Sequence, residues 1–253
     1  MTSIAHSVGS PCERCIQVSQ QSISKVQGSI QQISKLLVFD FFSGTGSSTQ
    51  AFEDSGHTVI KVELDEYFEA DERDILALTA EGLIGKYGQP DFIWASPPCQ
   101  KFSVASLWKY WEGTRGKSIP KHPAVYEAIA LVEHTVNLMQ ALKPTYGWIM
   151  ENPRGMLRHQ DVVKDLPRWT ISYCQYGDTR MKPTDLWGTI QGWIPRPMCK
   201  PRAACHESSP SGTNAGGTGK LRNARLRSMI PYELGKEICD VIHTNSDVHI
   251  EVI

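Results

Sequence analysis

The sequence places a thiol directly after a short apolar run. Cys99 is the third residue of a Pro-Pro-Cys-Gln segment at 97–100, and residues 92–95 before it have the composition of a buried parallel strand. Open α/β sheets bind ligands at the carboxyl ends of such strands, and the two prolines restrict the backbone that carries the thiol. The segment is typical of a nucleophile presented rigidly into a cleft; a buried structural cysteine is the alternative.

A glycine turn follows another apolar run. Residues 36–39 are apolar, Gly44 and Gly46 come shortly after them, and residues 48–54 are predicted to form a helix. A strand, a glycine turn and a helix together present backbone amides and a helix N-terminus to a ligand. Because the third glycine of a dinucleotide fingerprint is missing, a nucleoside-containing cofactor fits the turn better than NAD does. An ordinary turn is the alternative.

Carboxylates follow two further predicted strands. Residues 58–62 form the second strand, and Glu63 comes after it, about twenty positions beyond the glycine turn, where an acid can accept hydrogen bonds from ribose hydroxyls. Asp74 ends the next segment of the chain, before the predicted strand at 92–95. Glu151 follows the apolar residues 146–150 and precedes an Asn-Pro pair, so we interpret it as a reactive acid at a strand end and not as a helix cap.

Taken in order, these motifs resemble those of the DNA cytosine-5 methyltransferases, especially the compact kind that phages often carry. The resemblance covers roughly residues 36–190. The motifs together are specific for this family, and Pro-Cys-Gln is the one that is specific for it when taken alone. It implies an α/β fold, the Rossmann-like class I S-adenosylmethionine-dependent methyltransferase fold, with a mostly parallel doubly wound sheet and a small basic C-terminal insertion. The motifs are Phe-Ser-Gly-Thr-Gly at 42–46, the acids at 63 and 74, Pro-Cys-Gln at 98–100 and Glu-Asn-Pro at 151–153.

The resemblance also implies a role for each reactive group. Cys99 would add to C6 of cytosine, which makes C5 nucleophilic enough to accept a methyl group, and its thiol must be partly ionised. Glu151 would contact N3 and accept the charge that develops as sulfur adds. A cation is expected at the cytosine O2. Alignment with the family's Gln-x-Arg-x-Arg element favours Lys182, whereas chemistry favours Arg180, and Thr184 replaces the second arginine.

S-adenosylmethionine is therefore the expected cofactor. Its contacts are expected from the glycine turn, the two acids with their following residues, the proline before the thiol and the start of the C-terminal helix. They are Phe42, Ser43, Gly44, Thr45, Gly46, Glu63, Leu64, Asp74, Ile75, Pro98 and Ser228.

The charges are segregated along the chain although the net charge is −1. Residues 35–100 carry 4 basic and 12 acidic side chains, residues 101–122 carry 5 and 1, and residues 180–230 carry 9 and 2. A polyanion bound on one face would require this asymmetry; a basic tail without a ligand is the alternative. The expected partner is double-stranded DNA. Its expected contacts are Lys101, Ser103, Lys109, Arg115, Lys117, Arg222, Arg225 and Arg227.

Aromatic side chains alternate with cations in residues 101–122. Such a segment can stack on bases and neutralise phosphates. The resemblance implies that it closes over DNA once the target cytosine has flipped out of the duplex. Trp108 and Trp111 fit either a base-stacking role or ordinary core packing.

Composition divides the chain into four parts. Residues 1–35 are a polar extension with a heptad-like apolar stripe, which indicates either packing within the chain or a helix that forms a homodimer. Residues 36–190 are the catalytic domain, and residues 191–227 are a reduced target-recognition insertion rich in Pro, Gly, Ser and Arg. Residues 228–253 are a C-terminal helix that returns to the catalytic domain, with its helical pattern at 232–241. Within the catalytic domain, apolar residues at three- and four-residue spacing predict a helix over 123–142, and residues 170–174 are predicted to form a strand. The insertion is far shorter than the family's recognition domain.

The cysteines bear on location and on metal binding. Seven cysteines, one of them a nucleophile, predict a reducing compartment. No run is long enough to span a membrane and no signal core is present, so we expect a cytoplasmic protein, in the host cytoplasm if it is viral. Cys12 and Cys15 could join Cys199, Cys205 and His206 in a zinc site. These ligands come from distant segments, so we predict no metal.

The predicted function is methyl transfer from S-adenosylmethionine to C5 of cytosine in double-stranded DNA, through a covalent bond between Cys99 and C6. Three alternatives stay open at this stage. They are an RNA cytosine-5 methyltransferase, a non-catalytic module that binds DNA and cofactor, and an enzyme that transfers a group other than methyl.

Overall fold

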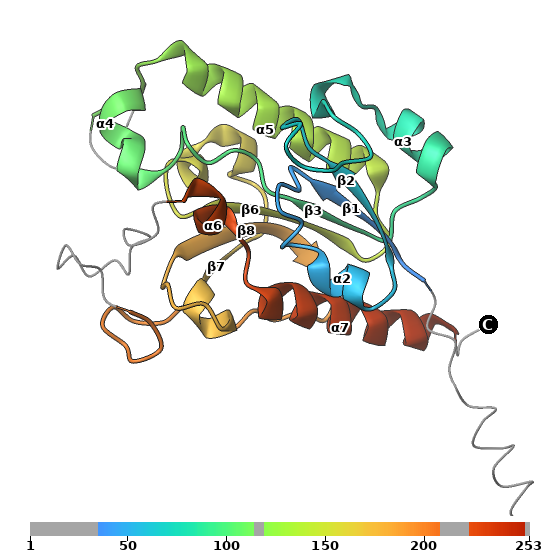
Figure 1. The fold of residues 1–253 in the computed structure, drawn as a ribbon. Helices are drawn as coiled ribbons and strands as arrows, with labels where there is room; N and C mark the ends of the chain where they lie inside the picture. Colours follow the sequence, from blue (N-terminus) through green and yellow to red (C-terminus); the bar gives the residue numbers. More distant parts are fainter. Residues whose placement is uncertain (1–34, 114–118, 208–222, 251–253) are drawn as a thin grey trace, which may run out of the picture. The chain divides into compact units, whose positions relative to one another are not determined.

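A computed structural model describes residues 35–113, 119–207 and 223–250 of the chain (Figure 1). The predicted heptad-like extension and three predicted DNA contacts, Arg115, Lys117 and Arg222, lie outside these ranges. Dimer formation through the extension therefore stays a prediction. Among the described helices, none combines the length and the apolar character that crossing a membrane requires.

A six-stranded sheet forms the centre of the described region, in the order β2-β1-β3-β6-β8-β7. Strands β2, β1, β3 and β6 are parallel, and β8 is antiparallel to both of its neighbours. A mostly parallel sheet was predicted, and this is confirmed. The strands are β1 (Leu37–Phe41), β2 (Thr58–Val62), β3 (Phe92–Ala95), β6 (Gly147–Pro153), β7 (Arg168–Ser172) and β8 (Pro183–Ile190), with a separate pair β4 (Trp111–Glu112) and β5 (Ile119–Pro120).

Helices cover both faces of this sheet (Figure 1). The α-helices are α2 (Gln50–Asp54), α3 (Ala80–Tyr87), α4 (Leu107–Tyr110), α5 (Pro123–Leu142), α6 (Ala224–Ser228) and α7 (Tyr232–Ile250). Helices α3 and α5 pack on one face and α2 and α7 on the other, each pair over its own apolar core. Short 3-10 turns connect them: η1 (Ile75–Ala77), η2 (Val104–Ser106), η3 (Leu157–His159), η4 (Asp161–Val163) and η5 (Tyr173–Tyr176).

Burial on both faces explains why the inner strands are continuously apolar. Along β1, Phe39 and Phe41 belong to the core under α5, whereas Val38 belongs to the core under α7. Successive side chains of a strand point to opposite faces, so one strand supplies both cores. The strands that lead into the predicted motifs are thereby fixed from both sides.

Several element boundaries differ from those predicted. The helix expected over 48–54 begins at Gln50. The strand expected over 170–174 ends at Ser172, and η5 follows it. The terminal helix continues past Val241 to Ile250. Strand β8 was not predicted at all, whereas helix α5 has the predicted bounds.

Candidate active site

One cleft with a volume of about 1310 Å³ opens at the carboxyl ends of β1, β2, β3 and β6. Because these strands are parallel, the segments that follow them meet at the same edge of the sheet. The cleft brings together the predicted reactive groups Cys99, Glu151 and Lys182 with most of the predicted cofactor contacts. Gly46 is the predicted cofactor contact that does not line it.

The glycine turn after β1 has an unusual backbone. Phe42, Gly44 and Gly46 all have positive φ angles, of 60°, 50° and 70°. Glycine adopts this region without steric cost, which explains its presence at two of the three positions. The Gly44 amide donates to Oε2 of Glu63 over 2.9 Å, and the Gly46 amide donates to the Ser43 carbonyl over 2.7 Å. The turn is therefore closed internally and tied to the end of β2.

A buried acid that the sequence analysis did not single out supports this turn. Asp40 on β1 is fully buried and accepts hydrogen bonds from the hydroxyls of Ser48 and Thr49, over 2.8 and 2.7 Å. Burial raises the pKa of Asp40 to about 6. An acid inside an apolar strand, followed by two hydroxyl residues, was the available signal. Its contacts fix the chain between β1 and α2.

The cofactor side of the cleft combines carboxylates with uncovered apolar side chains. Besides holding the turn, Glu63 accepts from the Asp65 amide over 2.9 Å, and Asp74 accepts from the Leu76 amide over 3.0 Å. Leu64 and Leu76 line the cleft although they are 68% and 57% exposed. A nucleoside presents apolar base faces and polar ribose hydroxyls, so this combination fits S-adenosylmethionine.

Cys99 is partly exposed in the same cleft, and its loop is fixed at both ends. The Phe102 and Ser103 amides donate to the Cys99 carbonyl over 3.0 and 2.9 Å. Asn152 Nδ2 donates to the Pro97 carbonyl over 2.9 Å, which ties the loop to β6. Burial raises the pKa of the Cys99 thiol, and the nearby Glu151 carboxylate raises it further.

Glu151, Tyr173 and Lys182 form a buried cluster beside this thiol. The Tyr173 hydroxyl donates to Oε1 of Glu151 over 2.8 Å, and Lys182 Nζ lies 3.9 Å from the same oxygen. Lys182 Nζ also lies 4.3 Å from the centre of the Tyr173 ring. Burial raises the pKa of Glu151 and lowers the pKa of Lys182. Tyr173 was not predicted, because no local pattern marks it.

The hydrogen bonds of Arg180 go to groups outside this cluster. Its Nε donates to Asp178 over 2.8 Å, and its Nη1 donates to the Leu226 and Arg227 carbonyls, each over 3.1 Å. Arg180 does not line the cleft and instead holds the segment of α6 against the turn after η5. Of the two cations that the sequence left open, the structure brings only Lys182 to Glu151.

The predicted DNA contacts in the described residues fall into two groups. Ser103, Arg225 and Arg227 line the cleft, and the guanidinium of Arg225 lies 3.4 Å from the centre of the Tyr67 ring. Ser228, predicted as a cofactor contact, also lines the cleft, and its hydroxyl donates to the Arg225 carbonyl over 2.8 Å. Helix α6 thus reaches the cofactor side.

The second group lies on and around α4. Lys101 donates to the Tyr110 hydroxyl over 3.2 Å, and Lys109 Nζ lies 5.1 Å from the centre of that ring. Trp111 is 4% exposed and donates from Nε1 to the Lys101 carbonyl over 2.7 Å, so it packs in the core. Trp108 is 77% exposed and leaves an aromatic face uncovered beside these cations.

Comparison with known proteins agrees with this geometry. The sequence profile of the C-5 cytosine-specific DNA methylase family matches residues 36–173. The chain is 30% identical over 163 residues to a probable DNA (cytosine-5)-methyltransferase of Frog virus 3, a match that covers 60% of this chain and 75% of the relative.

Two solved structures show lower similarity. Entamoeba histolytica methyltransferase EhMeth is 13% identical with a TM-score of 0.46, covering 66% of this chain and 57% of that one. Dnmt2 of S. pombe is 13% identical with a TM-score of 0.44, covering 64% and 52%. The chain thus spans little more than half the length of either protein.

The family match covers more than half of the chain, and it includes the glycine turn, both acids, the Pro-Cys-Gln segment and Glu151. The same motifs line one cleft at the edge of a doubly wound sheet. The chain therefore belongs to the C-5 cytosine-specific DNA methylase family and has the Rossmann-like fold of the S-adenosylmethionine-dependent methyltransferases.

Proposed function

We propose that this chain methylates C5 of cytosine in double-stranded DNA through a covalent bond between Cys99 and C6 of the flipped base. One observation carries the proposal: Cys99, Glu151 and Lys182 line the same cleft as the turn and acids that fit the cofactor. A nucleophile, an acid and a cation are the groups that activation of cytosine requires. Their common cleft would place the base beside the methyl donor.

Cys99 begins the reaction as a nucleophile. Its proton passes to solvent, a bond forms between the Sγ thiolate and C6, and the C5–C6 π electrons move to C5. The low stability of a thiolate in this buried position is the main obstacle, because burial raises the pKa of Cys99. The Lys182 ammonium opposes this effect and lowers that pKa, so Lys182 stabilises the reactive form of the thiol.

Glu151 acts on the opposite side of the base. Because burial raises its pKa, Glu151 holds a proton more readily than an exposed carboxyl does, and it can share that proton with N3 as negative charge moves into the ring. Tyr173 orients the carboxyl by donating to Oε1. Lys182, close to the same oxygen, is the cation that we place at the cytosine O2.

S-adenosylmethionine supplies an electrophilic methyl group when it is bound. Glu63 and Asp74 would hold its ribose and base, and Leu64 and Leu76 would cover its apolar faces. Methyl transfer to C5 breaks the methyl–sulfonium bond and would leave S-adenosylhomocysteine. C5 then loses its proton to water, the electron pair of that bond forms the C5–C6 double bond, and the Sγ–C6 bond breaks in the same elimination, so that Cys99 leaves as a thiolate.

Removing either acid is expected to weaken cofactor binding. In Glu63→Ala and Asp74→Ala, the affinity for S-adenosylmethionine should fall by about tenfold to a hundredfold, because hydrogen bonds to charged groups contribute about 1.5–3 kcal/mol. Isothermal titration calorimetry measures the change. Glu66→Ala is the matched control, since Glu66 is exposed and does not line the cleft. Unchanged affinity in both acid variants would contradict the assigned cofactor contacts.

Neutralising the cations of α6 is expected to flatten the salt dependence of DNA binding. In an Arg225→Gln, Arg227→Gln double variant, the slope of log K against log salt should fall by about 0.9 for each phosphate that these side chains no longer neutralise. Fluorescence anisotropy with a labelled duplex gives this slope. The control is Lys143→Gln, because Lys143 directly follows α5 and lies just before β6 begins, at the opposite edge of the sheet. Equal slopes in both variants would exclude α6 from the DNA interface.

A substrate comparison tests the proposed function itself. Purified protein is incubated with isotope-labelled S-adenosylmethionine and either unmethylated genomic DNA or total RNA. Label is expected at C5 of cytosine in duplex DNA, with little in RNA or in single strands. Label confined to RNA would replace the proposed substrate by RNA, and label in neither nucleic acid would favour a binding module.

A further inference from the structure

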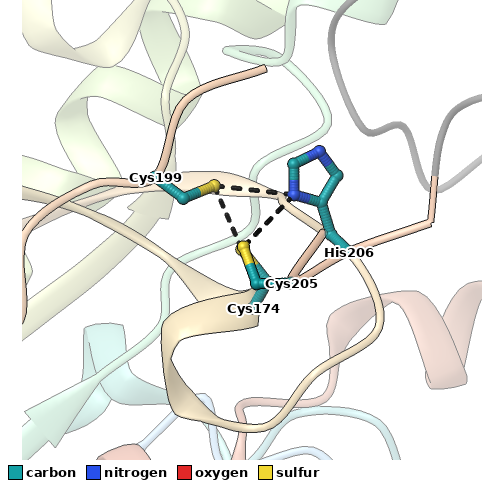
Figure 2. A group of neighbouring side chains, drawn as sticks. All are labelled: Cys174, Cys199, Cys205 and His206. Atoms are coloured by element: carbon teal, nitrogen blue, oxygen red, sulfur yellow. Dashed lines mark hydrogen bonds between the residues drawn. The ribbon is translucent and has the colours of Figure 1, made fainter. Parts of the chain in front are cut away.

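A second group of reactive side chains lies outside the cleft. Cys174 belongs to η5, directly after Tyr173, and Cys199, Cys205 and His206 belong to the segment that follows β8. None of these four residues lines the cleft. Figure 2 shows the four side chains gathered together, with Cys174 and Cys205 overlapping in this view, although Cys174 is 25 residues from the nearest of the other three.

The distances within this group have the pattern of a coordination shell. Cys205 Sγ lies 3.7 Å from Cys174 Sγ, and His206 Nδ1 lies 3.6 Å from both Cys199 Sγ and Cys205 Sγ. Cys174 Sγ and Cys199 Sγ are 3.2 Å apart. All four potential ligand atoms lie within 4.8 Å of one another.

Tetrahedral zinc requires nearly the same spacing. With Zn–S bonds of about 2.3 Å and Zn–N bonds of about 2.0–2.1 Å, the edges of the tetrahedron are about 3.8 Å between sulfurs and about 3.6 Å between sulfur and nitrogen. Of the distances above, only the one between Cys174 and Cys199 is clearly shorter than this. Three thiolates and one imidazole are also a ligand set that zinc prefers.

We propose that Cys174, Cys199, Cys205 and His206 bind one Zn²⁺ in a closed, structural site. On binding, each thiol releases its proton and the neutral imidazole coordinates through Nδ1. The protein fills all four positions, so no open position is left for a substrate or a reactive water. Gln175 Nε2, 3.4 Å from Cys205 Sγ, donates to one of the ligands, as outer groups commonly do in metal sites.

A disulfide explains the same group less well. The Sγ atoms of Cys174 and Cys199 are 3.2 Å apart, whereas a disulfide requires about 2.05 Å. A disulfide would also leave the third cysteine and the histidine without a role. The sequence suggested that Cys12 and Cys15 complete a zinc site with Cys199, Cys205 and His206. Cys174 takes their place here, and Cys12 and Cys15 lie outside the described residues.

The proposed zinc would fix the segment that follows β8. The first half of this segment is already held, because Trp193 and Arg196 both donate to Glu237 on α7, over 3.0 and 2.7 Å. The ligands hold its second half against η5. Lys200 and Arg202, both exposed, lie in the loop between the ligands at 199 and 205, so the metal would also fix where these two cations are displayed.

Metal analysis tests this inference without reference to methyl transfer. The full chain, purified under reducing conditions without a metal-affinity step, is expected to contain one Zn²⁺ per chain by inductively coupled plasma mass spectrometry. Cys205→Ser and His206→Ala should lose it on dialysis against a mild chelator, and circular dichroism checks that they fold. Cys205 is the most exposed ligand, so its replacement disturbs packing least. A Cys12→Ser, Cys15→Ser double variant is the matched control and should keep its zinc.

Co²⁺ exchange examines the ligand set in the wild-type protein. Thiolate-to-cobalt charge-transfer bands and the visible bands of tetrahedral Co²⁺ are expected, and Zn²⁺ should remove both. A wild-type protein that neither contains nor takes up Zn²⁺ would overturn the proposal. So would zinc that survives Cys205→Ser but leaves the Cys12, Cys15 variant, or a peptide map that shows a Cys174–Cys199 disulfide under reducing purification.

Discussion

Replacement of Cys99 by alanine is expected to abolish methyl transfer while cofactor binding survives. The reaction then lacks the nucleophile that activates C5, and loss of such a group typically lowers kcat by a factor on the order of 10⁴ or more. Cys99 borders the cofactor side of the cleft without holding the glycine turn, so the affinity for S-adenosylmethionine should stay within about twofold of the wild type, less than about 0.5 kcal/mol. Turnover is measured with labelled cofactor and affinity by calorimetry.

A duplex that contains 5-fluorocytosine tests the covalent bond directly. Fluorine at C5 cannot leave as a proton does, so the Sγ–C6 bond cannot break after methyl transfer and the complex survives denaturation. The wild type and a Cys239→Ser control, altered at a buried thiol of α7 outside the cleft, should both form this complex. Cys99→Ala should form none. Methyl transfer by the alanine variant would disprove the nucleophilic mechanism.

Changes at Glu151 and Lys182 are expected to move the reactivity of Cys99 in opposite directions. The Glu151 carboxylate raises the pKa of the thiol, so Glu151→Gln should lower that pKa and speed alkylation by iodoacetamide at a given pH. The Lys182 ammonium lowers the pKa, so Lys182→Met should raise it and slow alkylation. Rates measured across the alkaline range give the thiol pKa in each variant.

Methyl transfer should fall in both variants in spite of these opposite shifts. Glu151→Gln loses the proton shared with N3, which should lower kcat by about 10²–10⁴-fold even though its thiol is more reactive. This separation of thiol reactivity from turnover distinguishes an acid that acts on the base from one that only packs beside the thiol. Arg180→Lys is the control, since Arg180 contacts α6 and not the cluster. Alkylation rates that shift in the same direction would refute the assigned charges.

The sequence predicted the parts of the fold that depend on local pattern. Strands β2 and β3 and helix α5 have the predicted bounds, because continuous apolar runs and three- to four-residue spacing report burial directly. Strand β8 was missed because Asp185 and Gly188 interrupt its apolar pattern. Asp185 is buried where Arg158 from η3 and Thr170 from β7 both donate to it, and contacts between residues so far apart leave no local signal.

The residues of the candidate site also divide into those marked by a local sequence pattern and those that depend on contacts between distant residues. The positions of Cys99, Glu63 and Glu151 in the cleft could be predicted, since each follows an apolar run and belongs to a motif of fixed spacing. Glu151 was expected just after its strand, but β6 continues through it to Pro153. The choice between Arg180 and Lys182 could not be predicted, because the two are only two residues apart and differ in the partners that the fold gives them. Tyr173 and Cys174, which we propose as a zinc ligand, were missed for a related reason, as both depend on contacts across the fold.

The most direct test is nucleoside mass spectrometry on DNA and RNA from cells that express the wild type or Cys99→Ala. New 5-methylcytosine in the DNA of wild-type cells, and none in cells with the variant, is the predicted result. It would identify the reaction, the substrate and the nucleophile together. A modified cytosine of another mass would contradict methyl as the transferred group. New 5-methylcytosine in RNA alone, or in neither nucleic acid, would contradict DNA cytosine methylation as the function of this chain.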